Sequence, residues 1–493
     1  MKERESGILL PISALPGKYG IGDFGKAAYD FIDFLENSKQ KNWQILPLGV
    51  TSYGDSPYQC ISSYAGNPYF IDLDKLIELD YLTCGDIEKV DLGDNPIKID
   101  YAKLYTDKYK LLRIAYNNSK LILKEELSDY YTKNTFWIRE FALFMALKKA
   151  HNDKTWQEWE DKYKYFGNPE VEKFGEEHQD ELYFWVFTQY VFMKQWQELK
   201  QYANKKGIKV IGDLPIYVAS DSSDVWAHPD LFDLNKEFKP KTIAGVPPDD
   251  FTDTGQLWGN PIYSWEAMKK DDYKFWVDRI RHNLYLYSVL RIDHFKGFES
   301  YWEVPNGSLT AVGGRWVKGP STELFDKIKE ELGELEIIAE DLGFQTQEVI
   351  DLIENTGFPG MKILQFGFDP LDDSDNLPHN YKNNLVVYTG THDNKTVNDW
   401  FQTASEAEKK YAIEYLNLDE KEGYNWGLIR GVWSSVAYLA IAQLQDFLNL
   451  GEEARINTPA TFGGNWNWRF KEDDLDKELS DKIARITMTY RRG

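Results

Sequence analysis

The segment VIGDLPIYV at residues 210–218 is an apolar, β-branched run that carries one acidic residue, Asp213. The same pattern returns in SVLRIDHFKG at 288–297, EIIAEDLG at 336–343 and VVYTGTHDN at 386–394. Runs of this length and composition predict buried strands, and the acidic residue follows the apolar core of each one. We therefore expect four strands that end in polar, chemically active side chains.

Four further apolar runs raise the number of predicted strands to eight, at residues 7–13, 43–49, 361–366 and 436–442. Amphipathic segments with helical periodicity separate most of the strands. Such segments lie at residues 24–36, 183–205, 273–284, 323–332 and 347–355.

This alternation of strand and helix predicts an α/β protein with a parallel sheet. Eight such strands close most simply into a (β/α)8 TIM barrel, whose active site lies at the carboxyl ends of the strands. An open doubly wound sheet is the alternative, but no glycine-rich dinucleotide-binding motif follows any of the strands. We expect a single catalytic barrel domain over residues 1–493.

Two intervals are too long to be simple connections between neighbouring barrel elements. Residues 55–180 include the aromatic helical stretch ELSDYYTKNTFWIREFALFMALKKA and predict a largely helical inserted subdomain. Residues 220–270 are loop-rich, with three prolines and three glycines in GVPPDDFTDTGQLWGNP. Long loops in compact domains are often lids or binding loops, so both insertions are expected on the barrel rim.

Charge and composition exclude several classes of partner. The net charge of −23 repels nucleic acid phosphates and anionic lipids, so neither nucleic acid nor membrane is an expected partner. Cys60 and Cys84 are too few for a disulfide framework, and no apolar stretch approaches the roughly 20 residues that span a bilayer. The seven histidines show no metal-ligand spacing, and we expect neither metal nor cofactor. The expected compartment is the cytoplasm.

The acidic residues at the strand ends are the catalytic candidates. Any one of them could merely cap the following helix. Two of them, however, have a histidine beside the acid: His294 follows Asp293, and His392 precedes Asp393. Glu340 completes the set of three carboxylates.

Paired carboxylates suit glycosyl transfer, in which one attacks the anomeric carbon and the other protonates the leaving oxygen. Arg291 lies two residues before Asp293 on the same strand face, and its charge is expected to keep Asp293 ionised as a nucleophile. Glu340 follows the apolar residues 337–339 and is the expected general acid.

Aromatic side chains in predicted loops are candidate sugar-binding residues, because sugar rings have apolar faces that stack on them. We expect these rings to be less buried than those of the core. They are Tyr53, Tyr58, Phe251, Trp258, Trp466 and Trp468.

Nine segments, in order along the chain, carry a family resemblance that runs to about residue 469. They are SYGDSPYQ, GDLPIYV, GVPPDDF, GQLWGNP, RIDHF, AEDLG, FPGMKILQF, GTHDN and GNWNWR. Together they resemble the amylomaltase or disproportionating-enzyme family, the 4-alpha-glucanotransferases of glycoside hydrolase family 77. The family is related to the α-amylases but lacks their C-terminal β-sandwich domain.

The resemblance implies a retaining double displacement through a covalent glucosyl-enzyme. Asp293 in RIDHF is similar to the family's nucleophile, Glu340 in AEDLG to its acid/base, and Asp393 in GTHDN to its transition-state stabiliser. The loop around Phe251 is similar to the family's acceptor-side lid. The implied substrate-binding residues are Tyr53, Tyr58, Asp213, Phe251, Trp258, Arg291, His294 and His392.

The implied partners are malto-oligosaccharides, amylose or glycogen-derived α-1,4-glucans as donors, with glucose or another glucan as acceptor. Two alternatives remain open from the residues alone. One is a hydrolase of the α-amylase type, because water can also resolve a glycosyl-enzyme. The other is a non-catalytic glucan-binding barrel, which should have lost a catalytic acid, whereas all three are present here.

Overall fold

The eight predicted strands form a single parallel sheet in the computed structural model, which describes residues 2–52, 54–248, 252–343, 345–461 and 463–493. The order is β10-β11-β12-β1-β2-β3-β6-β9 in these described parts of the chain. The strands are β1 (Glu5–Leu9), β2 (Asn42–Gln44), β3 (Lys209–Leu214), β6 (Val289–Ile292), β9 (Ile337–Ala339), β10 (Gly360–Ile363), β11 (Leu385–Tyr388) and β12 (Leu439–Gln443).

The two outermost strands of this order meet, so the sheet closes on itself. The Ala339 amide at the end of β9 donates to the Pro359 carbonyl just before β10, at 2.9 Å. Leu290, Ile338 and Val387 are fully buried, and nearly all other apolar side chains of these strands are buried as well. The predicted (β/α)8 barrel is confirmed, and the open doubly wound sheet is excluded.

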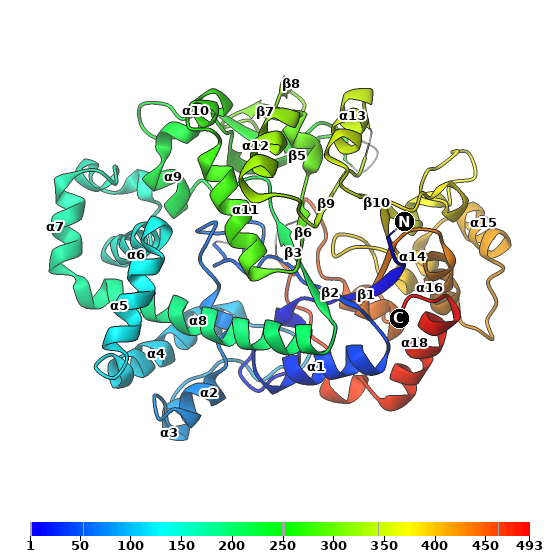
Figure 1. Cartoon of the computed structure of the whole chain (residues 1–493), viewed down its shortest axis with the longest axis horizontal. Helices are drawn as coiled ribbons and strands as arrows, with labels where there is room; N and C mark the ends of the chain where they lie inside the picture. The colour runs from blue at the N-terminus through cyan, green and yellow to red at the C-terminus, as the bar shows by residue number, and fades with distance from the viewer. Residues whose placement is uncertain (1, 53, 249–251, 344, 462) are drawn as a thin grey trace.

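Amphipathic helices surround the barrel, as the periodicity predicts, and the five predicted helices all form (Figure 1). Each turns its apolar stripe toward the sheet, which supplies most of the stability of such a helix. They are α1 (Lys26–Asn37), α8 (Gln179–Lys205), α11 (Lys274–Leu286), α12 (Thr322–Leu332) and α13 (Gln347–Thr356). Around the last strands lie α14 (Val397–Thr403), α15 (Glu406–Leu416), α16 (Tyr424–Ser434) and α17 (Leu444–Phe447).

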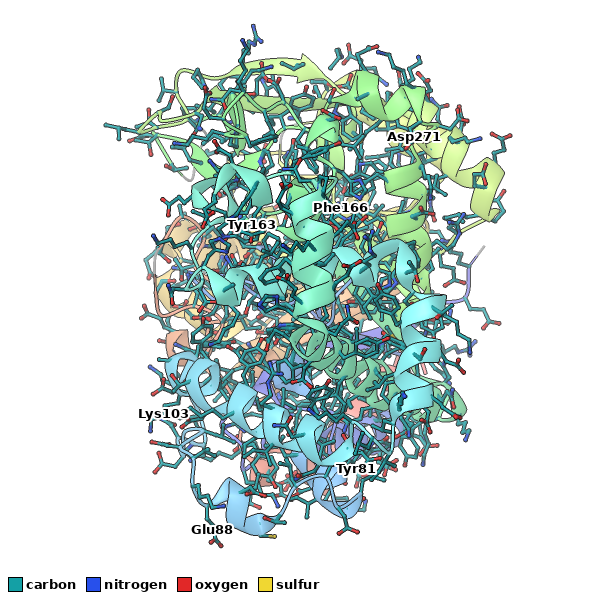
Figure 2. The ribbon with its side chains drawn as sticks, turned by 90° about the vertical axis from the view of Figure 1, so that its left-hand side faces the viewer. Tyr81, Glu88, Lys103, Tyr163, Phe166 and Asp271 are labelled. Carbon is teal, nitrogen blue, oxygen red and sulfur yellow. The ribbon has the colours of Figure 1, made fainter. Side chains whose placement is uncertain are left out.

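The long interval between β2 and β3 is helical and lies on one side of the barrel (Figure 1). Figure 2 looks onto this side, with Glu88 at its lower tip and Tyr163 and Phe166 higher up. The rings of Tyr109 and Phe141 both contact Trp185 of α8, which fastens the segment to the barrel helix. Its helices are α2 (Leu73–Glu78), α3 (Cys84–Ile87), α4 (Tyr101–Ser119), α5 (Lys124–Lys133), α6 (Thr135–Ala150) and α7 (Pro169–Glu177).

The interval between β3 and β6 contains more regular structure than its sequence predicts. In addition to α9 (Ser223–Ala227) and α10 (Trp265–Lys270), it forms two strands of an antiparallel sheet with order β5-β4-β7-β8, counted over the described residues. The glycines that suggest loops have local roles: Gly255, at φ +64°, occupies the turn between two of the strands. The strands are β4 (Thr242–Val246), β5 (Gln256–Pro261), β7 (Ser300–Pro305) and β8 (Arg315–Lys318).

The residues after β12 pack on the amino-terminal end of the chain. Arg492, which follows α18 (Lys477–Thr489), is fully buried and donates to the carbonyl oxygens of Trp433, Ser435 and Glu5. The described residues of this region form helices and turns and no β-sandwich. Within the described ranges, no helix is both long and apolar enough to cross a bilayer.

Candidate active site

The acidic residues predicted to be functional all lie at one end of the barrel. Asp213 is the next-to-last residue of β3, and Asp293, Glu340 and Asp393 follow β6, β9 and β11. Because these strands are parallel, their carboxyl ends meet at one mouth, where barrel enzymes build their active sites.

Arg291 joins two of these carboxylates. Its Nη1 donates to both oxygens of Asp213, at 2.7 and 2.6 Å, and to Oδ1 of Asp293 at 3.0 Å. The side chains of Arg291 and Asp213 are 3% and 0% exposed, whereas that of Asp293 is 27% exposed. The buried pair of Arg291 and Asp213 therefore anchors the more accessible Asp293.

Burial dominates the ionisation of Asp293. Desolvation raises the pKa of Asp293 to about 7, Arg291 opposes this rise, and the negative charges of Asp213, Glu340 and Asp393 reinforce it. The expectation that the charge of Arg291 keeps Asp293 ionised is therefore wrong near pH 7, because burial outweighs that charge. The sequence shows the neighbouring cation, but it does not show that Asp213 shares that cation.

Glu340 is fixed by backbone amides that approach it from two strands. The amide of His294 donates to Oε2 at 2.7 Å, and the amide of Leu342 donates to Oε1 at 2.9 Å. His294 lies in the left-handed region, with φ 50° and ψ 48°, a conformation that costs energy for a non-glycine residue and often marks a functional site. Through its amide, His294 holds the Glu340 side chain next to the segment that carries Asp293.

The pKa values of the two histidines at the strand ends are shifted in opposite directions. Burial lowers the pKa of His294 to about 4, so its imidazole is neutral at pH 7. Burial also acts to lower the pKa of His392, but the carboxylate of Asp393 outweighs this effect and raises it. The His392 Nε2 lies 3.3 Å from Asp393 Oδ2.

Asp393 is held as an ionised acceptor. Burial alone would raise its pKa, but His392 and a hydrogen bond from Asn457 lower the pKa of Asp393 to about 2. Asn457 Nδ2 donates to Oδ1 at 2.6 Å, and Arg455 donates to the Asp393 main-chain carbonyl at 2.9 Å.

Asn457 and Arg455 are therefore site residues that the sequence did not indicate. They come from RINTP at residues 455–459. This segment does not directly follow a predicted strand and carries no acidic side chain. The available signal was the proline and asparagine composition of a loop between the last strand and GNWNWR, which is typical of many structural loops as well.

Tyr58 reaches into the same cluster from the segment after β2. Its hydroxyl donates to Asp213 Oδ2 at 2.7 Å, and burial together with Asp213 raises the pKa of Tyr58, so the phenol stays protonated. The ring stacks on His392, with centroids 5.1 Å apart, and contacts Trp466 at 5.8 Å. Tyr58 thus links Asp213 to the region of Asp393.

Two of the loop aromatics are more buried than we expected. Trp466 and Trp468 belong to the core, because the loop that carries them folds back onto the barrel mouth. The Trp466 amide donates to the Ile456 carbonyl at 2.7 Å, and Arg469 donates to the carbonyl of Gly17 at 2.7 Å. Trp466 supports the ring of Tyr58, and Trp468 is a packing residue.

Trp258 of β5 lies on the side of the site that carries Glu340. Its ring meets the His294 ring edge to face, with centroids 4.8 Å apart. Gln59 donates to the Trp258 carbonyl at 3.1 Å, which joins this strand to the Tyr58 segment. Tyr53 and Phe251, the two other predicted binding residues, lie outside the described residues.

Two buried nitrogen atoms of the cluster have no hydrogen-bond partner among the described residues: Nε of Arg291 and Nδ1 of His392. Buried polar groups of this kind usually find a partner in water or a ligand, so the site suits a molecule rich in hydroxyl groups. No group of three or more His, Cys, Asp or Glu side chains within the described ranges could hold a metal ion.

Comparison with known proteins agrees with this geometry. A family model described as 4-alpha-glucanotransferase matches residues 10–475. The chain belongs to the 4-alpha-glucanotransferase family. A relative in the family from Clostridium butyricum is 54% identical over 483 residues, which cover 98% of this chain and 99% of that protein. Another, from Streptococcus pneumoniae, is 51% identical over 495 residues and covers 100% and 98%.

Solved structures show the same fold. The amylomaltase from Streptococcus agalactiae in complex with acarbose has a TM-score of 0.96 and 44% identity, over 100% of both chains. The amylomaltase from Corynebacterium glutamicum, at 18% identity and a TM-score of 0.77, covers 98% of this chain and 75% of that one and supports the fold alone. The predicted family membership is therefore confirmed.

Proposed function

We propose that this protein is a 4-alpha-glucanotransferase that moves α-1,4-glucan segments from a donor to the 4-hydroxyl of glucose or of another α-1,4-glucan. Membership of the family supports this activity. The observation that carries it is the convergence of Asp293, Glu340 and Asp393 at one barrel mouth, with Arg291 and the His294 turn joining the first two.

The first step assigns opposite roles to Asp293 and Glu340. An ionised Asp293 oxygen attacks the anomeric carbon of the donor, and a covalent glucosyl ester forms with inversion. The bond from that carbon to the glycosidic oxygen breaks, and protonated Glu340 gives its proton to the leaving oxygen. The shortened glucan then leaves.

The second step reverses these roles. The acceptor 4-hydroxyl gives its proton to Glu340 and attacks the anomeric carbon, and the ester bond to Asp293 breaks. The second inversion restores the α-configuration, so the transfer retains stereochemistry. Asp293 leaves as a carboxylate beside Arg291, which stabilises its charge.

Asp393, His392 and Asp213 hold the sugar that is being transferred. Asp393 is ionised over the whole neutral range, so it accepts hydrogen bonds from sugar hydroxyls. Its charge also favours the positive character that develops at the anomeric carbon in an oxocarbenium-like transition state. Tyr58 and Trp258 supply ring faces at the two sides of the site.

Transfer prevails over hydrolysis when the acceptor is held in attack geometry and water is kept out. Residues 220–270 are proposed as the acceptor-side lid, with Phe251 and Trp258 as proposed substrate-binding residues. The order that β4 and β5 give to this insertion supports that role. Residues 55–180 are proposed as an inserted subdomain of a single catalytic domain.

The proposed donors are malto-oligosaccharides, amylose or glycogen-derived glucans, and glucose is a proposed acceptor. Carboxylate chemistry of this kind needs neither metal nor cofactor. The proposed location is the cytoplasm, where substrates of this class and free thiols such as Cys60 and Cys84 are compatible. The net charge of −23 disfavours nucleic acid and anionic membranes as partners.

Incubation of the purified protein with maltotriose tests this function. A transferase yields glucose together with oligosaccharides longer than maltotriose, because each transferred segment is added to another chain. A hydrolase of the α-amylase type yields only shorter sugars, and a non-catalytic binding protein leaves maltotriose unchanged. Separation of the products by chain length distinguishes the three outcomes.

A further inference from the structure

The hairpin of β7 and β8 carries an exposed apolar patch that the proposed mechanism does not use. Trp316, Val312 and Leu309 are 45%, 58% and 96% exposed. Single exposed apolar side chains are common, but three on one hairpin that includes a tryptophan suggest an interaction site.

Trp316 is held in place by its neighbours. It pairs across the strands with Trp302, and the two rings meet edge to face with centroids 5.3 Å apart. Trp302 Nε1 donates to the Ala311 carbonyl at 2.9 Å, and Ala311 and Val304 are fully buried beside it. The Trp316 side chain is therefore held by Trp302 and remains 45% exposed to solvent.

This patch is continuous with the active site. The Lys296 ammonium lies 4.6 Å from the centre of the Trp316 ring, and Lys296 is the second residue after His294. The Ala311 amide donates to the Thr254 carbonyl at 2.9 Å, so the hairpin also contacts the turn between β4 and β5. The patch thus lies between the turn at residues 293–296 and the proposed lid.

The position of Glu340 indicates on which side of the cleavage point the patch lies. Glu340 acts on the oxygen of the leaving chain, and the acceptor later takes the place of that chain. The turn that leads to Lys296 is bonded to Glu340 twice: the His294 amide to its side chain at 2.7 Å, and the Phe295 amide to its carbonyl at 2.9 Å. Asp393 and its partners belong to different elements.

We propose that Trp316, with the Lys296 ammonium over its ring, is a remote acceptor-side platform for a glucose residue of an α-1,4-glucan, beyond the residue next to the cleavage point. The exposed part of the indole contacts the apolar face of the sugar, and the ammonium donates to the sugar hydroxyls. The platform favours long acceptors over glucose. This inference rests on the proposed transferase activity.

The test compares acceptors of different length with the full-length protein. Maltotriose is the donor, and labelled glucose or labelled maltotetraose is the acceptor. We expect Trp316→Ala to lower the ratio of kcat/KM for maltotetraose to that for glucose by roughly three- to tenfold. Trp316→Phe, which keeps a ring, should retain most of the ratio. Tyr285→Ala removes another exposed aromatic side chain and should not alter it.

An unaltered ratio in folded Trp316→Ala, in a protein that still transfers glucans, would overturn the platform and leave the proposed function intact. An unaltered ratio together with a lower molecular mass by light scattering would assign the patch to contact with a second copy of the chain and would also overturn it. If the wild-type protein makes no sugar longer than maltotriose from maltotriose, the proposed function fails, and the platform fails with it. If the alanine variant does not fold, Trp316→Thr, which removes the ring and suits a β-strand, replaces it with the same expected fall in the ratio.

Discussion

Arg291 and Asp293 share one hydrogen bond of 3.0 Å, and the same Arg291 nitrogen also serves both oxygens of the buried Asp213. The cation therefore does not belong to Asp293 alone. Asp213 takes two of the three contacts and adds a negative charge of its own close by. Burial is the main cause of the high pKa of the proposed nucleophile; Arg291 opposes it, and the negative charge of Asp213 adds to the rise.

The pH dependence of the reaction should reveal this high pKa. Burial raises the pKa of Asp293 to about 7, and the ionised form is needed for attack. As the pH falls below 7, Asp293 becomes protonated, and kcat/KM should fall about tenfold per pH unit. Initial rates with maltotriose between pH 4 and 9 check this prediction. A rate that stays constant down to pH 5 would contradict it.

Asp213→Asn should move that acid limb to lower pH. The substitution removes a like charge that raises the pKa of Asp293 and leaves Arg291 to act more strongly on Asp293. The maximal rate also falls, because Asp213 is a proposed sugar contact, so the midpoint of the limb is the quantity to compare. Asp230→Asn, an exposed position, is the matched control. A midpoint that stays in place or rises would argue against a shared Arg291.

Asn457→Ala should lower kcat/KM by about 10- to 100-fold, the value of one hydrogen bond to a charged group. Asn457 fixes Asp393 through a bond of 2.6 Å and helps to keep the pKa of Asp393 low. Thr461→Ala, in the same loop, removes a hydroxyl that bonds Thr458 and Asn465 and should have little effect. Equal losses in the two variants would indicate a general disturbance of the loop.

The two functions of Tyr58 can be separated by substitution. Tyr58→Phe removes the hydrogen bond to Asp213 and keeps the ring on His392, whereas Tyr58→Ala removes both. We expect kcat/KM to fall in both variants, with a further loss of roughly three- to tenfold in the alanine variant, because an aromatic contact contributes about 0.5–1.5 kcal/mol. If the two variants have the same activity, the ring has no part in binding.

The barrel strands were predictable because burial requires long apolar runs and a barrel requires their regular alternation with helices. VLRI before Asp293 and IIA before Glu340 are such runs, and both form strands. The antiparallel sheet was not predictable in this way. Its strands are no shorter than those of the barrel, but they contain polar residues and, in three of the four, glycine or proline, which also predict loops.

The site was only partly predictable, for physical reasons that differ between its residues. Asp293 and Glu340 stand directly after strands, and Asp393 lies five residues after the end of β11, so the barrel topology itself brings them together. Asn457 is an uncharged side chain in a distant loop, and its bond to Asp393 depends on how that loop folds over the mouth. The ionisation of Asp293 depends on burial and on a shared partner, which a linear sequence does not display.

The most direct test of the account is to trap the covalent intermediate. Glu340→Gln with α-maltotriosyl fluoride should form the ester, because fluoride leaves without an acid, and should resolve it slowly, because no base activates the acceptor. Digestion and mass spectrometry should then find the added maltotriosyl group on the peptide that contains Asp293. A label on any other carboxylate, or turnover of the fluoride with no added mass under conditions where wild-type protein is active, would contradict the assignment of Asp293 as the nucleophile.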